Sequence, residues 1–348
     1  MQKNKRIGWI DIARGVGVLS IIFSHTGYLP LSAYLTPVIH TFMIPVFLFI
    51  GGYLFQPGAN FLSFAKNKIN KLLGAYVIFF LISSIIWFFI RSGYSSSILD
   101  IPYQTLLTGF VLGKGTMING PLWFLTAYFS SLILVRSIYY WGEKRNRVNK
   151  LLLAFFFILL FLILKKETIF TPFSYDLVLL FSGYLLLGRL LYIYRKRLFT
   201  ARFLLLTIII FILGVFRNGE TNIYSRVIHN PVLFIINSLS GSFLVLYFSQ
   251  TLEKIFNKYL KFIKYTGRNS LVFFSIHWPA MQLSTFLLGL TGIINQTNSV
   301  ATSTNFFFPT VGPSSQVTLI RLSLFISYTL VSLFSGWVVI LFMNYKRG

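Results

Sequence analysis

The amino-acid sequence predicts an all-α, polytopic membrane protein with about ten transmembrane helices and with both termini in the cytoplasm. Two observations predict this class: 55% of the 348 residues are hydrophobic, and apolar runs of about twenty residues, the length that crosses a bilayer, recur along the chain. A third observation predicts the orientation, because short clusters of Lys and Arg lie between alternate runs. Neither a second domain nor an internal repeat is visible, so residues 1–348 are interpreted as a single domain.

The first five apolar runs are separated by basic and polar connections in alternation. The first run continues at full span length without a small-residue cleavage site, so we expect it to be the first helix rather than a removed signal peptide. In chain order, these expected helices are residues 7–28 after a basic N-terminus, 32–55 before a basic cluster at 66–71, 72–91 before a polar loop, 120–141 before a basic cluster at 144–150, and the shorter run 148–166.

The last five runs follow the same alternation. In chain order, they are residues 173–193 before a basic cluster at 195–202, the short run 202–217 before a polar loop, 230–250 before a basic stretch at 254–268, 268–290 before a third polar loop, and 319–343 before Lys346 and Arg347. Because the fifth and seventh runs are short, eight spans with re-entrant pieces are the alternative to ten. The side that carries the basic clusters is expected to face the cytoplasm.

The net charge is +24, and the chain has no cysteine. Such a charge in a soluble protein would suggest nucleic acid, but here the basic residues cluster between apolar runs rather than on an aromatic-rich face. We therefore interpret the charge as a topology signal and expect no nucleic-acid partner. The absence of cysteine excludes disulfides, thiolate metal sites and cysteine nucleophiles, and we expect no bound metal.

Three expected outer loops, residues 92–119, 218–229 and 291–318, are poor in charge and rich in Ser, Thr, Asn and Gly. Such loops suit contact with water and with polyhydroxylated ligands, although ordinary outer loops have the same composition. Within the second loop, Arg217, Glu220 and Arg226 are expected to form a solvated cluster.

Three ionisable residues, Asp11, Arg14 and His25, lie inside the first expected helix, where each costs about a few kcal/mol to hold in hydrocarbon. At about 100° per residue they fall within roughly 60° of one another, so one helix face carries all three, and Arg14 and His25 stand about 16 Å apart along the axis. Gly15 and Gly17 keep the backbone beside Arg14 thin, so that a neighbouring helix or a ligand can approach. This stripe indicates either an interior ion pair with a polar contact or part of a functional site.

Further motifs follow this helix in order. They are GGYLF at residues 51–55, a basic pair formed by Lys68 and Lys71, PLWFL at 121–125, and YTGRNSLVFFSIHWP at 265–279. Together with the D-x-x-R-G element and the histidine that follows Arg14 after ten residues, they resemble the acyltransferase-3 family of membrane acyltransferases. This family includes bacterial O-acetyltransferases of cell-surface glycans and fucose 4-O-acetylase-like proteins. The basic pair is lysine here where family members usually have arginine.

The resemblance implies an O-acetyltransferase of the bacterial plasma membrane. It implies acetyl-CoA as the acyl donor and a hydroxyl of a cell-envelope glycan as the acceptor, such as capsule, exopolysaccharide, teichoic acid or a lipid-linked precursor. The expected partners are therefore acyl-CoA, a glycan or lipid-linked sugar and the lipid bilayer, and a homo-oligomer is compatible with the sequence.

An attacking alcohol needs a base within hydrogen-bond reach, and histidine titrates in the right range, so His25 is the candidate general base; it is alternatively the acyl acceptor of a covalent route. Arg14, Lys68 and Lys71 are the candidates for the phosphates of coenzyme A. Asp11 is expected to orient the guanidinium of Arg14 and to compensate its charge.

Four polar or aromatic residues in other expected helices are candidate acceptor-binding residues: His40, Trp123, Asp176 and His277. Each also has a plainer interpretation, as a contact between helices, a membrane anchor or an interfacial residue. The competing function is a transporter or flippase in which Asp11, Arg14 and His25 relay protons or bind an anion. The lack of visible repeated halves counts against a transporter.

Overall fold

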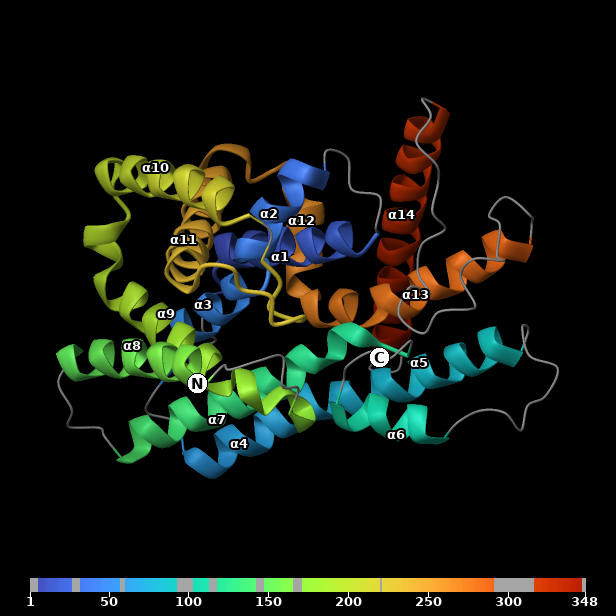
Figure 1. The fold of residues 1–348 in the computed structure, drawn as a ribbon, viewed down its shortest axis with the longest axis horizontal. Helices are drawn as coiled ribbons and strands as arrows, with labels where there is room; N and C mark the ends of the chain where they lie inside the picture. The colour runs from blue at the N-terminus through green and yellow to red at the C-terminus, as the bar shows by residue number, and fades with distance from the viewer. Residues whose placement is uncertain are drawn as a thin grey trace.

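The computed structural model describes residues 6–26, 32–56, 60–92, 103–112, 118–141, 147–164, 171–219, 221–290 and 316–345. Within these ranges the protein is almost wholly helical and contains no β-strand, which confirms the predicted all-α class (Figure 1). The α-helices are α1 (Gly8–His25), α2 (Ser32–Phe42), α3 (Pro45–Tyr53), α4 (Phe61–Lys68), α5 (Gly74–Ser92), α6 (Tyr103–Leu112), α7 (Trp123–Trp141), α8 (Arg147–Leu164), α9 (Val178–Leu198), α10 (Ala201–Asn218), α11 (Pro231–Phe256), α12 (Lys261–Arg268), α13 (Ser270–Leu290) and α14 (Gln316–Tyr345).

Eight helical segments of the described chain are long and apolar enough to cross a membrane. They are Tyr34–Tyr53, Phe61–Ile90, Gly120–Tyr140, Pro172–Leu198, Ala201–Asn218, Pro231–Phe256, Ser270–Leu290 and Leu322–Asn344. The two other expected spans are present as helices, but α8 is apolar only over Asn149–Leu164, and α1 carries the ionisable stripe. The protein is therefore a multi-pass membrane protein, and the count of ten spans stays a prediction.

One of the expected helices is divided into two, and another is preceded by a separate short helix. The expected helix 32–55 is α2 and α3, which meet just before Pro45, because a proline lacks the N–H group that a continuous helix would need and fits best at a helix start. The expected helix 268–290 is preceded by the separate helix α12, and Asn269, with φ −107° and ψ 22°, forms the break between α12 and α13.

Two further elements were not expected from the sequence. Helix α4 precedes α5 and is capped by Asn60, whose side chain accepts hydrogen bonds from the backbone N–H groups of Leu62 and Ser63; a π-helical turn, Ile69–Leu73, joins it to α5. Helix α6 lies inside the expected loop 92–119. The rest of that loop, apart from its ends, and residues 291–315 of the third loop lie outside the described residues.

Helix α1 lies in the interior, where it packs against α3, α11, α12 and α13. Its residues Ile12 and Ala13 are fully buried. The backbones of α1 and α12 approach closely, since a Cβ atom on Gly267 would lie 1.7 Å from the carbonyl oxygen of Asp11, and one on Gly15 would lie 2.3 Å from that of Ile263. In lipid no hydrophobic driving force acts between helices, and small residues allow the close van der Waals packing that holds them together instead. The expected close approach of a helix beside Arg14 is thus confirmed.

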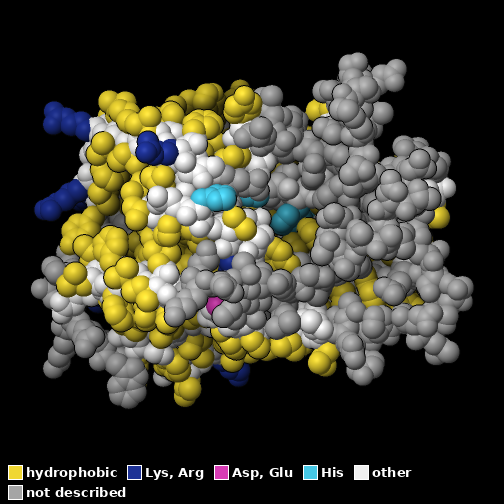
Figure 2. Space-filling model, in the orientation of Figure 1, with side chains coloured by type: hydrophobic (Ala, Val, Ile, Leu, Met, Phe, Trp, Pro, Cys, Tyr) yellow, Lys and Arg dark blue, Asp and Glu magenta, His cyan; other side chains and the backbone are white. Residues whose placement is uncertain are grey.

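Two ends of the helical body differ in chemistry. At the first, which we call the basic end, the start of α1 meets the ends of α3 and α9, because the ring of Trp9 lies 5.3 Å from that of Tyr53 and 6.3 Å from that of Phe199. At the other, the histidine end, α1 finishes at His25. Hydrophobic side chains cover much of the face in Figure 2, and histidine side chains are visible near its centre.

Candidate functional site

A cavity of about 330 Å³ opens beside the first turns of α1 and has four charged residues in its wall. We call it the basic cavity. Arg6, Asp11 and Arg14 line it from the α1 side, and Arg189 and Tyr192 line it from α9. The guanidinium of Arg189 lies 4.7 Å from the centre of the Tyr192 ring, so the aromatic face holds this cation in place. A cavity with three arginines and a single carboxylate suits an anionic ligand.

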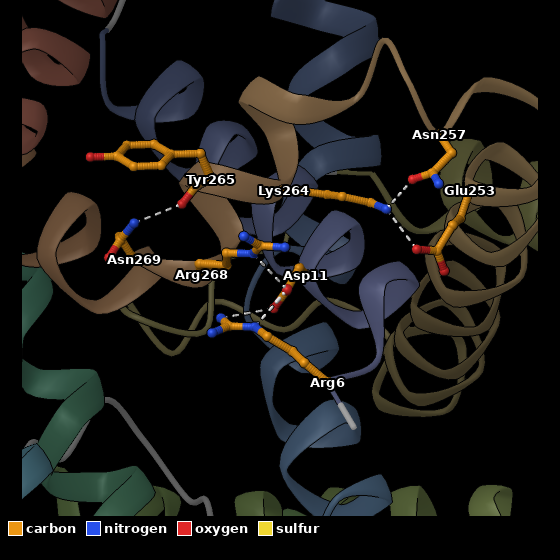
Figure 3. A network of polar contacts seen from close by, with 8 residues as sticks. All are labelled: Arg6, Asp11, Glu253, Asn257, Lys264, Tyr265, Arg268 and Asn269. Atoms are coloured by element: carbon orange, nitrogen blue, oxygen red, sulfur yellow. Dashed lines mark hydrogen bonds and ion pairs between the residues drawn. The ribbon is translucent and has the colours of Figure 1, made fainter. Parts of the chain in front are cut away.

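Asp11 does not orient Arg14, contrary to the expectation from the sequence. Its buried carboxylate accepts from Nε of Arg6 at 2.8 Å and from Nε of Arg268 at 3.2 Å, and thereby joins the start of α1 to the end of α12 (Figure 3). Among the described residues no hydrogen bond or ion pair joins Asp11 to Arg14. Asp11 and Arg14 are three residues apart on one helix face, and the carboxylate is within electrostatic range of Arg14, but its hydrogen bonds go to Arg6 and Arg268.

A second ion pair stands beside the first in Figure 3. Nζ of Lys264 donates to the Glu253 carboxylate at 2.6 Å and also to the side-chain oxygen of Asn257. These contacts fasten α12 to the end of α11, just as Asp11 fastens α12 to α1. Helix α12 is therefore held on both sides by charge.

Arg14 lines two cavities at once. The first is the basic cavity, and the second is a smaller one of about 140 Å³, the middle cavity, where Arg14 meets Tyr128, Phe124 and Phe274. Within the described part of the chain no hydrogen bond or ion pair occupies the Arg14 guanidinium. Arg14 is thus a partly buried cation at the junction of two cavities, and its guanidinium can bind an anion.

Lys68 and Lys71 lie at the junction of α4 and the π-helical turn. Lys68 is within electrostatic range of both Lys71 and Arg14, although neither lysine lines the basic or the middle cavity. The Nζ atom of Lys68 stands 5.3 Å from the ring centre of Phe64. The two lysines therefore add positive charge near Arg14 rather than forming the cavity wall, and their role as phosphate ligands stays a prediction.

A third cavity, of about 210 Å³, lies at the histidine end and brings together residues from four separate helices. We call it the histidine cavity. Its wall includes His25, His40, Trp123, Tyr224 and Trp278. Phe124 and Phe274 line both this cavity and the middle cavity. The three cavities therefore follow one another along α1, with Arg14 shared by the first two and the phenylalanine pair shared by the last two.

His25 is hydrogen-bonded to His277, and the bonds assign its reactive nitrogen. Nδ1 of His277 lies 2.7 Å from the carbonyl oxygen of Phe274, and since a carbonyl can only accept, this Nδ1 carries the proton. In a neutral imidazole, Nε2 of His277 is then an acceptor, and it lies 2.9 Å from Nδ1 of His25. Nδ1 of His25 is consequently the donor, and its Nε2 keeps a free lone pair.

His277 is fully buried and lies behind His25 rather than in the wall of the cavity. His277 therefore contacts His25 instead of lining the cavity in which an acceptor was expected. A residue outside α13 completes the hydrogen bonding of the helix near His277. Pro279 has no N–H group to donate to the carbonyl oxygen of Ser275, and Nδ2 of Asn119 donates to that oxygen instead, at 2.8 Å. Because Asn119 lies two residues before the PLWFL segment, this bond connects the start of α7, which carries Trp123, to the helix that carries His277.

Asp176 does not line the histidine cavity but forms a buried ion pair at its rim. Nε and Nη2 of Arg226 donate to its two carboxylate oxygens at 2.9 and 3.1 Å. Arg226 is 3% exposed, so the expectation of a solvated cluster is wrong for this residue. The same guanidinium donates to the carbonyl oxygen of Tyr224 and lies 5.7 Å from the Trp123 ring centre. The pair holds segment 221–230 against the cavity.

Several of these residues escaped the sequence-based search. Arg226 was predicted only as part of a solvated cluster, and no local pattern relates it to a cavity. Arg189 is a lone arginine within an apolar run, which is the one signal that would have identified it. Trp278, which is adjacent to His277 in the sequence, also lines the histidine cavity, and its ring lies 5.2 Å from that of His25.

No group of three or more His, Asp or Glu side chains that could hold a metal is present in the described ranges. In comparisons with known proteins, residues 7–341 match the model of a family described as an acyltransferase domain. No match was found among curated proteins or among solved structures. The family match covers every helix that forms the three cavities.

Proposed function

The chain belongs to the acyltransferase-3 family of membrane acyltransferases, and we propose that it transfers an acetyl group from acetyl-CoA to a hydroxyl of a cell-envelope glycan. One observation carries the proposal, namely the row of cavities along α1 that leads from a cationic chamber at Arg14 to a basic nitrogen at His25. The separation of these two residues along the helix, about 16 Å, is of the order that the pantetheine arm of coenzyme A spans.

The donor enters from the basic end in this proposal. By the positive-inside rule, that end faces the cytoplasm, where acyl-CoA is made. Arg14 and Arg189 meet the phosphates in the basic cavity, while Lys68 and Lys71 raise the local positive potential. The acyl end passes through the middle cavity and enters the histidine cavity beside Phe124 and Phe274, which line both cavities and whose rings contact each other at 5.5 Å.

His25 acts as general base through Nε2. The acceptor hydroxyl gives its proton to this nitrogen while its oxygen attacks the thioester carbonyl carbon; the carbon–sulfur bond then breaks, and the imidazolium returns the proton to the leaving sulfur. The products are an O-acetyl ester and free coenzyme A. His277 keeps the proton of His25 on Nδ1 throughout, so that Nε2 is the nitrogen that faces the reaction.

The wall of the histidine cavity supports a sugar acceptor. Trp123 and Tyr224, whose ring centres lie 6.0 Å apart, present aromatic faces of the kind that pack on sugar rings, and Asn222 supplies an amide beside them. His40 lines the same wall and is the further polar group within reach of an acceptor hydroxyl. The glycan is therefore acetylated near the outer membrane face, in the bacterial plasma membrane.

Purified protein in lipid nanodiscs, supplied with radiolabelled acetyl-CoA and envelope glycan fractions, tests the proposal. We expect the wild type to form labelled glycan and His25→Ala to lose at least about a hundredfold of the rate, since a general base contributes roughly 10²–10⁴-fold. His229→Ala is the matched control, because His229 is exposed and lies outside the three cavities. We expect this control to retain the wild-type rate.

Each contrary outcome has a defined meaning. Full activity of His25→Ala would contradict the assignment of the base. Label that becomes attached to the protein itself, in the absence of acceptor, would indicate the covalent route through His25 instead of direct transfer. A wild type that never forms labelled glycan with any fraction, but moves an anionic solute across the membrane, would favour a transporter.

A further inference from the structure

A cavity of about 540 Å³ lies outside the proposed reaction path, between two pairs of helices. Helix α8 packs on α9, and α10 packs on α11; the two pairs stand apart on the left of Figure 1. The cavity, which we call the lateral groove, is lined by side chains of all four helices, including Leu151, Leu190, Leu206 and Phe243. Three of these helices, α9, α10 and α11, are apolar enough to cross a membrane.

The lateral groove has almost no polar wall. Its few hydroxyl-bearing residues include Thr207, whose Oγ1 is already satisfied by the carbonyl oxygen of Phe203. Several lining side chains are exposed, among them Leu151 at 40%, Phe155 at 47% and Leu206 at 53%, so the groove opens at the surface of the protein. In a membrane-spanning region, an apolar groove with this opening is filled by hydrocarbon, which means a lipid chain.

Cations stand at the basic end of the groove. On α9 the lining residues Leu190, Tyr194 and Leu198 form one stripe, and at about 100° per residue Arg197 falls at the edge of that stripe. Arg202 directly precedes the lining residue Phe203 in the first turn of α10. Both arginines are exposed, and no hydrogen bond or ion pair joins either of them to another residue of the described chain.

We propose that the lateral groove is a binding site for one anionic phospholipid, with an acyl chain along Leu190 and Leu206 and the headgroup phosphate between Arg197 and Arg202. Charge complementarity selects the lipid class, because basic residues at the membrane surface attract anionic headgroups. The positive end of the α10 helix dipole adds to the positive potential at the same place.

This site is separate from the donor path. Arg189 and Tyr192, which line the basic cavity, lie on the opposite face of α9 from Leu190, Tyr194 and Leu198. Arg197 and Arg202 line none of the three cavities of the proposed reaction path. Lipid binding can therefore be tested without altering a residue of the proposed catalytic machinery.

The test measures lipid affinity of the full-length protein in detergent, by native mass spectrometry and by the shift of the thermal unfolding midpoint. Phosphatidylglycerol and phosphatidylcholine with identical chains are the probes. We expect the wild type to bind phosphatidylglycerol in preference, and R197A/R202A to bind it about thirtyfold more weakly, since each surface cation contributes roughly a factor of five to ten. Leu206→Trp, which places an indole in the groove, should weaken binding of both lipids at this site.

Matched controls separate a site from a general surface effect. K254A/K258A removes two exposed positive charges at the end of α11, and Leu213→Trp adds an indole to α10 outside the groove lining. Both controls should bind phosphatidylglycerol as the wild type does. An equal loss in K254A/K258A, equal wild-type affinity for the two lipids, or unchanged binding in R197A/R202A would each overturn the proposal.

Discussion

Nδ1 of His25 lies 2.9 Å from Nε2 of His277, and the two ring planes are within 8° of parallel. The residues are 252 positions apart in the sequence and come from helices α1 and α13. Because Nδ1 of His277 is committed to the Phe274 carbonyl, the direction of the whole chain of hydrogen bonds is fixed. A backbone carbonyl does not take up a proton. This chain of hydrogen bonds therefore orients His25 and leaves the proton on its Nδ1.

The first prediction concerns His277. His277→Gln keeps an acceptor near the position of Nε2, whereas His277→Phe keeps a ring of similar shape and removes the acceptor. We expect the glutamine variant to stay within about tenfold of the wild-type kcat and the phenylalanine variant to lose about a hundredfold, with the KM for acetyl-CoA unchanged in both. Steady-state kinetics measure the difference.

Nitrogen NMR of histidine-labelled protein in nanodiscs gives a second reading that does not depend on activity. The chain has four histidines, so the His25 signals can be assigned by comparison with His25→Ala. We expect a protonated Nδ1 and an unprotonated Nε2 at neutral pH. The reverse tautomer, or equal activity of the two His277 variants, would contradict the positioning role.

The second prediction concerns Asp11. Its carboxylate joins Arg6 and Arg268, whose side chains are 56% and 50% exposed, so solvent weakens both ion pairs. We expect Asp11→Asn to lower the free energy of unfolding by about 1–2 kcal/mol while leaving the KM for acetyl-CoA near that of the wild type. Thermal unfolding and kinetics of the same preparation measure the two quantities. An increased KM at unchanged stability would instead assign Asp11, which lines the basic cavity, a role in binding the donor.

The stripe on α1 illustrates what the sequence can predict. Spacing along one helix placed Asp11, Arg14 and His25 on one face, and the structure has Arg14 and His25 facing consecutive cavities. Helical periodicity works here because it is a local property. The predicted partner of Asp11, Arg14, was wrong because the carboxylate accepts a hydrogen bond from Arg268, which is 257 residues away in the sequence.

The other residues of the site that the sequence did not predict also depend on contacts between distant segments. Asp176 and Arg226 are 50 residues apart, and their pairing depends on how segment 221–230 folds back to the 3-10 turn Pro172–Leu177 before α9. Arg226 has a positive φ of 59°, which local sequence does not reveal for an arginine. Arg189 faces a cavity only because α3 and α9 pack closely. Contacts between distant segments therefore determine the parts of the site that residue spacing cannot.

The third prediction compares two glycines. Gly267 lies where α12 touches the backbone of α1, whereas the nearest atom to a Cβ on Gly74 would be 3.8 Å away. We expect Gly267→Ala to lower the free energy of unfolding by at least about 2 kcal/mol, because the clash is with backbone that cannot move aside. Gly74→Ala, the matched control, should be neutral or stabilising by up to about 1 kcal/mol. Equal thermal midpoints for the two variants would show that α1 and α12 do not touch there.

The fourth prediction concerns the ion pair at the rim of the histidine cavity. The Arg226 and Asp176 side chains are 2% and 18% exposed, so loss of one charge leaves the other poorly solvated. We expect Asp176→Asn and Arg226→Gln each to cost about 3 kcal/mol of unfolding free energy. The double variant, which restores neutrality and allows an amide–amide hydrogen bond, should cost less than the sum of the single variants by about 2 kcal/mol.

Enzyme kinetics of the same Asp176 and Arg226 variants test whether this ion pair supports the acceptor site. Because Arg226 holds Tyr224 and Trp123, the single variants should raise the KM for the glycan acceptor several-fold, while the KM for acetyl-CoA stays unchanged at the far end of the cavity row. A double-mutant cycle on thermal stability, followed by kinetics with each substrate varied in turn, measures both effects. Additive stability losses would contradict a direct pair, and a raised KM for acetyl-CoA alone would place the acceptor elsewhere.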